Sequence, residues 1–276
     1  MSSASEITRK AKSNLAFALN ILPRERREDM VVFYAFCRTM DDLADDPGVA
    51  PEERLRFLNA WEHGITRGFE TPDEFQRELI SLRDRRQIPN DFLVAIIDGC
   101  RMDLQPQRFE TWDKLSEYIW KVACAVGLVS IRIFGCTDPG SERYAVALGH
   151  ALQLTNILRD IDEDLANGGR IYLPLADMAR FQYTEQDLID RVRDARFLAL
   201  MAYEAERAEA FFHQAAEALP VADRRALVPA RIMGEIYHLL LEKMRDDRFH
   251  VFGKRYRVSK ARKLAILSKH LIARSS

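Results

Sequence analysis

Residues 152–164 read LQLTNILRDIDED, and residues 33–46 read FYAFCRTMDDLADD. In each stretch, an apolar segment with helical spacing runs into a cluster of acids. At 3.6 residues per turn, Asp41 and Asp45 share one helix face, and Asn156, Asp160 and Asp164 share another. Because like charges at this spacing repel by roughly 0.2–0.5 kcal/mol per pair, we expect a cation beside them. Mg²⁺ is the first candidate, with Mn²⁺ as the alternative, since both suit carboxylate, water and phosphate oxygens.

Each acidic cluster also has a plainer interpretation, as a solvated helix end or face. Pro47-Gly48 follows the first cluster directly, where exposed acids are common. However, acids at a helix C-terminus oppose the macrodipole, and an arginine (Arg38 or Arg159) precedes each cluster with donors suited to phosphate. The two clusters together therefore favour a metal–diphosphate site. Four acids lie off the shared faces and are expected only to add local negative potential: Asp42, Asp46, Asp162 and Glu163.

Composition indicates a soluble protein with a sizeable core. The 276 residues are 47% hydrophobic and 30% charged, and the net charge of −1 gives no indication of nucleic acid binding. The charge is uneven, because residues 248–276 hold nine Lys or Arg and no acid. Such a tail could cover a bound diphosphate, touch an anionic membrane, or form a solvated terminal helix. These three readings stay open.

The cysteines and the first residues bear on location. Four scattered cysteines in apolar contexts, with no CxxC pair, argue against zinc and against a disulfide framework. The stretch Met1–Ala11 lacks the apolar segment of a signal peptide, and no apolar run approaches a membrane span. We expect a cytoplasmic protein, with peripheral contact at the inner membrane surface as an alternative. The sequence leaves the oligomeric state open.

Almost the whole chain is expected to be helical. Thr71-Pro72-Asp73-Glu74 predicts a helix start with Thr71 as N-cap, and residues 184–187 predict another before one long helix to about residue 219. Asn167-Gly168-Gly169 predicts a helix end. Residues 122–134 and 145–158 are apolar on more than one face, which is typical of interior helices. We predict one all-α domain over residues 1–276, a helical bundle with a central apolar cavity.

Other common chemistries lack their motifs. The chain has no Walker loop, no GxGxxG and no GxSxG, which argues against P-loop nucleotide hydrolysis, a Rossmann site and a nucleophile elbow. The six histidines are dispersed without metal-binding spacing.

The motifs together resemble the squalene/phytoene synthase family. Residues 34–45 are similar to its first aspartate motif, and residues 154–164, continuing through Gly169-Arg170-Ile171-Tyr172-Leu173-Pro174, are similar to its second. Tyr118 and residues 122–127 match an intervening segment, although Cys124 stands where the family usually has glycine. Residues 21–23 and 257–259 also fit, so the resemblance spans nearly the whole chain.

The resemblance implies an isoprenoid synthase fold and head-to-head joining of two prenyl diphosphates. The metal ligands it implies are Asp41, Asp45, Asn156, Asp160 and Asp164. The catalytic positions it implies are Tyr118, Arg159 and Tyr172. The substrate contacts it implies are Arg38, Gln153, Asn156, Arg170, Tyr237 and Arg257, with Arg257 closing the phosphate end.

The amino-acid sequences of the motifs are most similar to those of bacterial presqualene diphosphate synthases of the hopanoid pathway. That similarity implies two farnesyl diphosphates as substrates, with no requirement for NADPH. A phytoene synthase using geranylgeranyl diphosphate is the runner-up, and a complete squalene synthase using NADPH is a further alternative. A non-enzymatic assembly factor of the same fold is disfavoured, because both aspartate motifs are intact.

Overall fold

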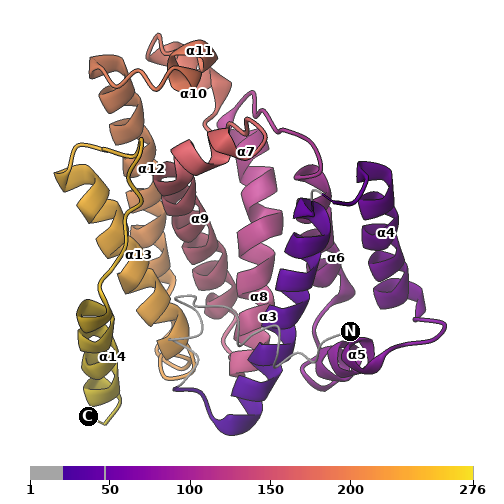
Figure 1. Ribbon diagram of the computed structural model, residues 1–276. Helices are drawn as coiled ribbons and strands as arrows, with labels where there is room; N and C mark the ends of the chain where they lie inside the picture. Colours follow the sequence, from indigo (N-terminus) through magenta and orange to yellow (C-terminus); the bar gives the residue numbers. More distant parts are fainter. Residues whose placement is uncertain (1–20, 47, 276) are drawn as a thin grey trace.

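The all-α prediction is confirmed. In the computed structural model, which describes residues 21–46 and 48–275, every regular element is a helix (Figure 1). The stretch Met1–Ala11 lies outside the described residues. Within the described part of the chain, no helix combines the length and apolar character needed to cross a membrane.

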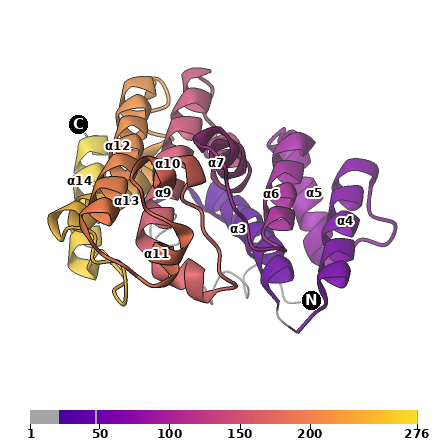
Figure 2. The same cartoon turned by 90° about the horizontal axis from the view of Figure 1, so that it is seen from above.

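The chain runs through the following helices, with a π-helical turn designated η1: α3 (Arg24–Asp45), α4 (Pro51–Arg67), α5 (Glu74–Arg85), α6 (Asn90–Met102), α7 (Trp112–Ile119), η1 (Trp120–Cys124), α8 (Ala125–Phe134), α9 (Gly140–Ala166), α10 (Leu175–Arg180), α11 (Glu185–Ile189), α12 (Ala195–Ala218), α13 (Val228–Asp246) and α14 (Lys260–Ser275). Helices α4 and α5 form one edge of the bundle, and α13 and α14 form the opposite edge (Figures 1 and 2). Helices α3, α8 and α9 lie between the two edges.

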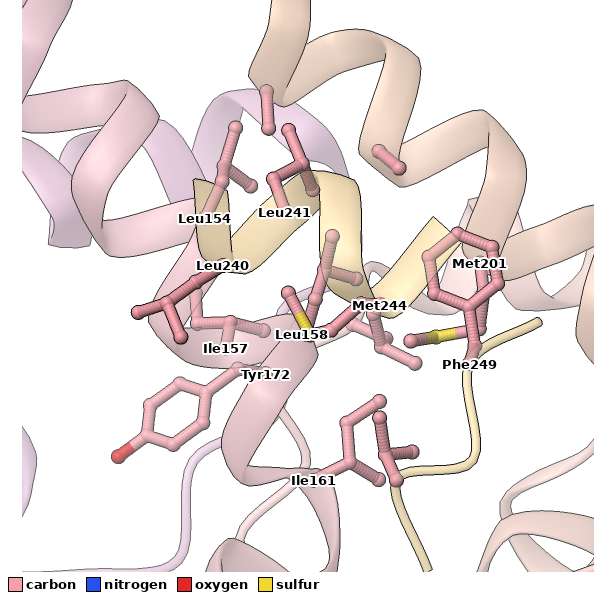
Figure 3. Close-up of a cluster of buried hydrophobic side chains, with 14 of the residues drawn as sticks. Leu154, Ile157, Leu158, Ile161, Tyr172, Met201, Leu240, Leu241, Met244 and Phe249 are labelled. Atoms are coloured by element: carbon pink, nitrogen blue, oxygen red, sulfur yellow. The ribbon is translucent and has the colours of Figure 1, made fainter. Parts of the chain in front are cut away.

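Helix α9 has an apolar face that packs in the core and a polar face that carries the second acidic motif. Figure 3 shows its apolar face, where Leu154, Ile157, Leu158 and Ile161 pack against Leu240, Leu241 and Met244 of α13 and Met201 of α12. All of these residues are buried. Because burying such a side chain contributes about 1.5–3 kcal/mol, this cluster fixes the rotation of α9 about its axis. The polar positions between them are thereby directed away from this core.

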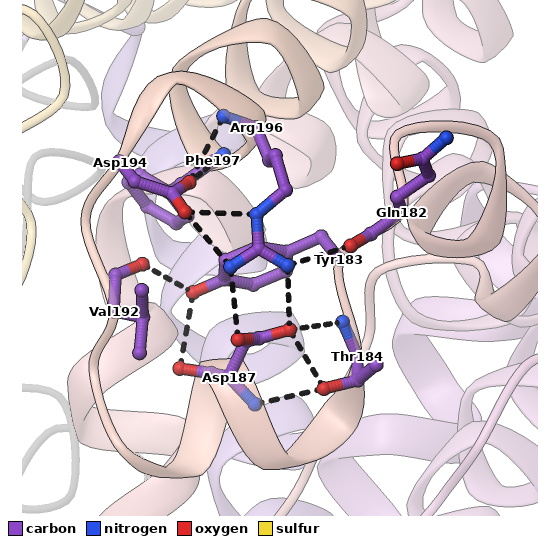
Figure 4. A network of polar contacts seen from close by, with 8 residues as sticks. All are labelled: Gln182, Tyr183, Thr184, Asp187, Val192, Asp194, Arg196 and Phe197. Atoms are coloured by element: carbon purple, nitrogen blue, oxygen red, sulfur yellow. Dashed lines mark hydrogen bonds and ion pairs between the residues drawn. The ribbon is translucent and has the colours of Figure 1, made fainter.

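The predicted long helix after residue 184 is broken into α11 and α12. Asp194 caps α12 by accepting hydrogen bonds from the backbone N–H groups of Arg196 and Phe197, at 2.9 and 3.1 Å. Arg196 then pairs with both Asp187 (3.0 Å) and Asp194 (2.8 Å), which joins the two helices (Figure 4). Hydrogen bonds from Thr184, together with Arg196, lower the pKa of Asp187 to about 2. The prediction of one continuous helix was wrong because a second N-cap interrupts the helical run.

The start of α5 also differs from the prediction by two residues. Asp73, rather than Thr71, is the N-cap, and its carboxylate accepts a hydrogen bond from the Gln76 backbone N–H at 2.8 Å. The Gln76 side chain in turn accepts from the Asp73 backbone N–H at 3.0 Å. This reciprocal capping box satisfies two otherwise unpaired donors, which Thr71 could not do from its position.

Small residues let η1 and α8 approach α9 closely. A Cβ atom added at Gly149 would lie 2.9 Å from Cα and Sγ of Cys124, and one added at Gly127 would lie 3.1 Å from the Ala145 carbonyl oxygen. The Cys124 thiol, which stands where glycine was expected, lies 3.3 Å from the Val146 carbonyl oxygen. The missing side chain of Gly149 therefore makes room for that of Cys124.

Candidate active site

An apolar cavity of about 460 Å³ lies between α3, η1, α8, α9 and α13. Its polar wall includes Asp41, Asp103, Tyr118, Gln153 and Asn156. Hydrophobic side chains line most of the remainder, including Met30, Phe33, Phe134, Tyr144, Leu148 and Met233. The structure thus confirms the predicted central cavity, and it provides both a charged region and a long apolar region.

Helix α3 carries the first acidic motif to this cavity. Asp41 reaches solvent through the open cavity, yet protein surrounds it on most sides, and this burial raises the pKa of its carboxyl to about 6. The charges of Asp45 and Asp103 also raise the pKa, whereas that of Arg38 lowers it. Arg38 itself forms an ion pair with Asp42 at 2.6 Å.

Helix α9 carries the second motif on its polar face. Burial and the charge of Asp160 raise the pKa of Asp164 to about 7. The Asn156 amide donates to Gln153 Oε1 at 3.3 Å, but its own Oδ1 is buried without a hydrogen-bond partner. Oδ1 is the atom with which asparagine would bind a cation, and an unpaired buried oxygen is costly.

The described residues contain no group of three acidic, histidine or cysteine side chains close enough to enclose a metal ion by themselves. The candidate metal ligands instead lie on two helices, with Asp41 and Asp45 on α3 and Asn156, Asp160 and Asp164 on α9. Carboxyls of raised pKa and an unsatisfied amide oxygen fit divalent cations that take their other ligands from water and diphosphate. The donor set is therefore compatible with Mg²⁺.

Besides Arg38, the arginines at positions 159, 170 and 255 contact acids of the two motifs. Arg170 donates to Asp45 Oδ1 at 2.7 Å and to the Asp103 carbonyl oxygen at 3.1 Å. Arg159 donates from Nε to Asp160 Oδ1 at 2.8 Å. Arg255 lies 2.9 Å from Glu163 and 3.6 Å from Asp160. These guanidinium groups offer donors for phosphate oxygens at the charged region of the cavity.

Asp103 and Arg255 were not found by reasoning from the sequence. Asp103 directly follows the apolar helix α6, as Asp160 follows an apolar segment in α9, but it is a lone acid and so gave a weaker signal. Arg255 lies in the basic tail, where Arg257 was expected to close the phosphate end. Arg257 is exposed, and the contact described for it is its backbone carbonyl accepting from Lys243 at 3.0 Å.

The predicted tyrosines occupy different depths. Tyr118 and Tyr237 line the cavity, whereas Tyr172 lies behind Tyr118, with ring centroids 5.4 Å apart.

The Arg159 guanidinium stays charged beside the second motif. Burial lowers the pKa of Arg159, but its interactions with Asp160 and Tyr237 outweigh that effect and raise the pKa overall. The structure thus brings all the predicted residues except Arg257 to the cavity or to the acids at its charged region.

Sequence and structure comparisons agree with this architecture. A family model for squalene/phytoene synthases matches residues 8–262. A presqualene diphosphate synthase of Rhodopseudomonas palustris is 37% identical over 266 residues, covering 94% of this chain and 93% of that protein. A 15-cis-phytoene synthase of Synechococcus elongatus is 34% identical over 276 residues, covering 95% and 89%.

Solved structures show the same relationship. A dehydrosqualene synthase bound to a ligand superposes with a TM-score of 0.82 at 30% identity, covering 99% of this chain and 95% of that one. A squalene synthase of Alicyclobacillus acidocaldarius gives a TM-score of 0.81 at 29% identity, covering 90% and 94%. With two acidic motifs facing one apolar cavity, and a family match over most of its length, this chain belongs to the squalene/phytoene synthase family.

Proposed function

We propose that this prenyltransferase joins two farnesyl diphosphates head to head to give presqualene diphosphate. The family performs head-to-head condensation of prenyl diphosphates. The observation that carries the proposal is a cavity whose polar wall holds Asp41 of the first motif with Gln153 and Asn156 of the second, and whose remainder is hydrophobic. The presqualene diphosphate synthase of R. palustris, at 37% identity over nearly its full length, supports the choice of product.

The residues at the charged region would hold the leaving diphosphate. Asp41 and Asp45 on one helix, and Asn156, Asp160 and Asp164 on the other, would bind the divalent cations. When bound, these cations supply Lewis-acid stabilisation of the charge that develops on the diphosphate. Arg159, Arg170 and Arg255 add fixed positive charge, which costs no reorganisation during the reaction.

The apolar region would hold the prenyl chains and protect the reacting carbons. The allylic carbocation left by the departing diphosphate is attacked by the double bond of the second prenyl diphosphate. Loss of a proton then closes the cyclopropane ring, with the released diphosphate as a candidate base. Tyr118 and the hydrophobic lining exclude water, which would otherwise capture the cation.

The direct test incubates the pure protein with Mg²⁺ and either farnesyl or geranylgeranyl diphosphate, with and without NADPH. We expect presqualene diphosphate from the farnesyl substrate, with no effect of NADPH. Consumption of the geranylgeranyl substrate alone would overturn the proposal, and formation of squalene on addition of NADPH would identify a complete squalene synthase.

Phytoene synthase is the second candidate. The 34% identity to the S. elongatus 15-cis-phytoene synthase over 95% of this chain favours it. The chemistry at the charged region would be the same, because the two reactions differ in prenyl length and in the fate of the cyclopropane. The substrate pair in the test above separates the two candidates.

We also propose that the basic C-terminal segment contacts an anionic membrane, from which apolar substrates arrive or to which products leave. Arg257, Lys260 and Arg262 are exposed and, among the described residues, have no ion-pair partner. Leu264 on the same helix is 54% exposed. Near an anionic surface each such cation contributes about 1 kcal/mol, which salt weakens. The predicted cytoplasmic location agrees with this proposal.

Sedimentation with phosphatidylglycerol vesicles tests the membrane contact. We expect binding that falls with salt and that is lost in the double variant Lys260→Glu/Arg262→Glu. The matched control, Arg56→Glu/Arg67→Glu, makes the same charge change on α4 at the opposite edge of the bundle. Equal loss in both variants, or equal binding to phosphatidylcholine, would contradict a specific role for α14.

A further inference from the structure

A carboxylate outside both aspartate motifs accepts hydrogen bonds from two phenols, one that lines the cavity and one that lies behind it. The Tyr118 hydroxyl donates to Asp103 at 2.9 Å (Oδ2) and 3.1 Å (Oδ1), and the Tyr172 hydroxyl donates to Oδ1 at 3.1 Å. The two tyrosine rings stack with an interplanar angle of 24°. Phe109 packs against both, with centroids 5.2 Å from Tyr118 and 6.0 Å from Tyr172. Asp103 is thus the polar centre of a cluster of three aromatic rings.

The direction of these hydrogen bonds follows from the chemistry of the groups. An ionised carboxylate can only accept, so both phenols must donate to it. Burial and the charge of Asp103 raise the pKa of Tyr118 and of Tyr172, which keeps both phenols protonated. With each phenolic hydrogen directed at Asp103, the two oxygens have only lone pairs left for other contacts.

The same residue is tied to the first aspartate motif. Arg170 donates to the backbone carbonyl of Asp103 and to the carboxylate of Asp45. The charge of Asp103 also contributes to the raised pKa of both Asp41 and Asp164, so it lies within electrostatic reach of both walls. Asp103 therefore links the aromatic cluster to the charged region of the cavity.

We infer that Asp103 is a positioning residue for the proposed condensation: it directs the hydroxyl hydrogens of Tyr118 and Tyr172 away from the reacting carbons. This inference rests on the proposed function. A ring held in this way offers electron density to a nearby carbocation, which ring faces stabilise. Its oxygen presents no donor hydrogen to the cavity, and both carboxylate oxygens of Asp103 are occupied by phenols. The cation is thus stabilised at close range while water is kept from its surroundings.

Asp103→Asn provides the test, because it keeps the size of the side chain and removes one acceptor. With the amide oxygen at the Oδ1 position, which lies 3.1 Å from both phenols, the NH₂ group would replace Oδ2, the nearer acceptor of the Tyr118 hydroxyl at 2.9 Å. The Tyr118 oxygen would then face a donor, and its own hydrogen would be less firmly directed at residue 103. We expect kcat for the coupled product to fall about tenfold or more while KM changes less than about threefold. We also expect a larger share of prenyl alcohol, formed when water captures the cation. A purely structural defect would lower activity without changing this product ratio.

The matched control is Asp98→Asn, five residues earlier on α6, where the carboxylate pairs with Arg101 and does not line the cavity. It should leave kcat and the alcohol share unchanged. The double variant Asp103→Asn/Tyr118→Phe should be little worse than either single variant, because both changes break the same hydrogen bond. Multiplied effects in the double variant would contradict the inference, as would a fully active Asp103→Asn protein with an unchanged product ratio.

A spectroscopic measurement separates this inference from the proposed function. Burial raises the pKa of both phenols and the charge of Asp103 raises it further, and Asp103→Asn removes only that charge. In the ultraviolet difference titration of the variant against the wild-type protein, we expect additional tyrosine ionisation at high pH while both proteins remain folded. Asp98→Asn should not show this change. A wild-type protein that couples neither substrate would refute the proposed function alone. An unchanged tyrosine titration in a folded Asp103→Asn protein would refute the positioning role.

Discussion

At the scale of single residues, Asp160 and Asp162 offer a direct comparison. Both lie on α9, but Asp160 is on the motif face, while Asp162 pairs with Arg191 at 2.6 Å and accepts from the Gly253 backbone N–H at 2.8 Å. We predict that Asp160→Ala lowers kcat by about a hundredfold or more, because charge on the leaving group is no longer stabilised. Asp162→Ala should retain most of the turnover. Steady-state kinetics on both variants, with circular dichroism to confirm folding, makes the comparison.

A full loss of turnover in Asp162→Ala at unchanged stability would contradict this division of the acids. A wild-type protein without turnover, together with an Asp160→Ala protein that kept its biological function, would point to the non-enzymatic assembly role considered from the sequence.

Glu204 predicts a pH dependence of stability that is separate from the site. It is 1% exposed, and burial raises its pKa to about 7 from an ordinary value of 4.5, although Arg207 acts in the opposite direction. The folded state therefore holds a proton that the unfolded state has released, so stability falls as pH rises between these two values. We expect the free energy of unfolding to drop by roughly 1–3 kcal/mol over this window.

Urea unfolding at a series of pH values measures this effect. In Glu204→Gln the contribution is absent, so the difference in stability between variant and wild type should shift in favour of the variant as pH rises from about 5 to about 8. A constant difference between the two proteins would show that Glu204 stays charged in the folded state.

Some of the site residues could be predicted from the sequence, and others could not. Asp41, Asp45, Asn156, Asp160 and Asp164 could be grouped because helical periodicity places them on common faces. Asp103 reaches Tyr172, 69 positions away, only through tertiary packing. No local pattern encodes a contact of this range, so the sequence could not predict it.

At the scale of elements, the contact between η1 and α9 predicts a large effect from a small change. In Gly149→Ala the new methyl group would lie 2.9 Å from the Cα atom of Cys124, and backbone cannot move aside cheaply. We expect a loss of about 1–3 kcal/mol in the free energy of unfolding. The control is Gly234→Ala on α13, where the nearest atom is the end of the Leu148 side chain, at 3.2 Å. That side chain can rotate, so the control should be near neutral.

Thermal or urea unfolding of both variants checks this prediction. Equal losses at Gly149 and Gly234 would mean that α9 is no more tightly packed against η1 than against α13.

Helices were easier to predict than their exact limits. The periodicity of α9 and the stop at Asn167 were both visible in the sequence, and α9 does end at Ala166 with Asn167 as its C-cap. The break between α11 and α12 was not visible. Aspartate is a preferred N-cap, but it also occurs on exposed helix faces, and it is the hydrogen bonds that the Asp194 carboxylate accepts from two backbone N–H groups that identify it as a cap. Local composition could not distinguish these two roles.

At the scale of the whole molecule, the placement of the motif acids on two different helices predicts that metal ion and diphosphate bind cooperatively. Since no three acidic side chains of the described residues converge, a metal ion needs ligands from outside the protein. We expect Mg²⁺ and inorganic diphosphate together to raise the melting temperature more than the sum of their separate effects, because they bridge α3 and α9. Differential scanning fluorimetry measures this, and a chelator should reverse it.

The control for this measurement is Asp164→Asn, which removes one ligand and should reduce the combined effect. Simple additivity of the metal and diphosphate effects in the wild-type protein would show that each has an independent site.

The fold class and the family could be inferred from the sequence, but the choice of prenyl chain could not. Two spaced acidic motifs define leaving-group chemistry through local periodicity. The apolar region is formed by residues as distant as Met30, Phe134 and Met233, and its length depends on how their helices pack. A phytoene synthase and a presqualene diphosphate synthase are similar to this chain at comparable identity, 34% and 37%. The sequence similarity therefore identifies the family without identifying the prenyl chain.

The glycine contacts between η1, α8 and α9 give the cavity one rigid wall and one compliant wall. On the rigid wall, backbone meets backbone, and any larger side chain would push two helices apart. Where α13 faces α9, flexible side chains such as Met233 of α13 and Leu148 of α9 fill the space. Adaptation to longer or shorter prenyl chains should therefore accumulate on α13 and spare the η1–α9 contact. Directed evolution toward another chain length would find most of its accessible substitutions on that compliant wall.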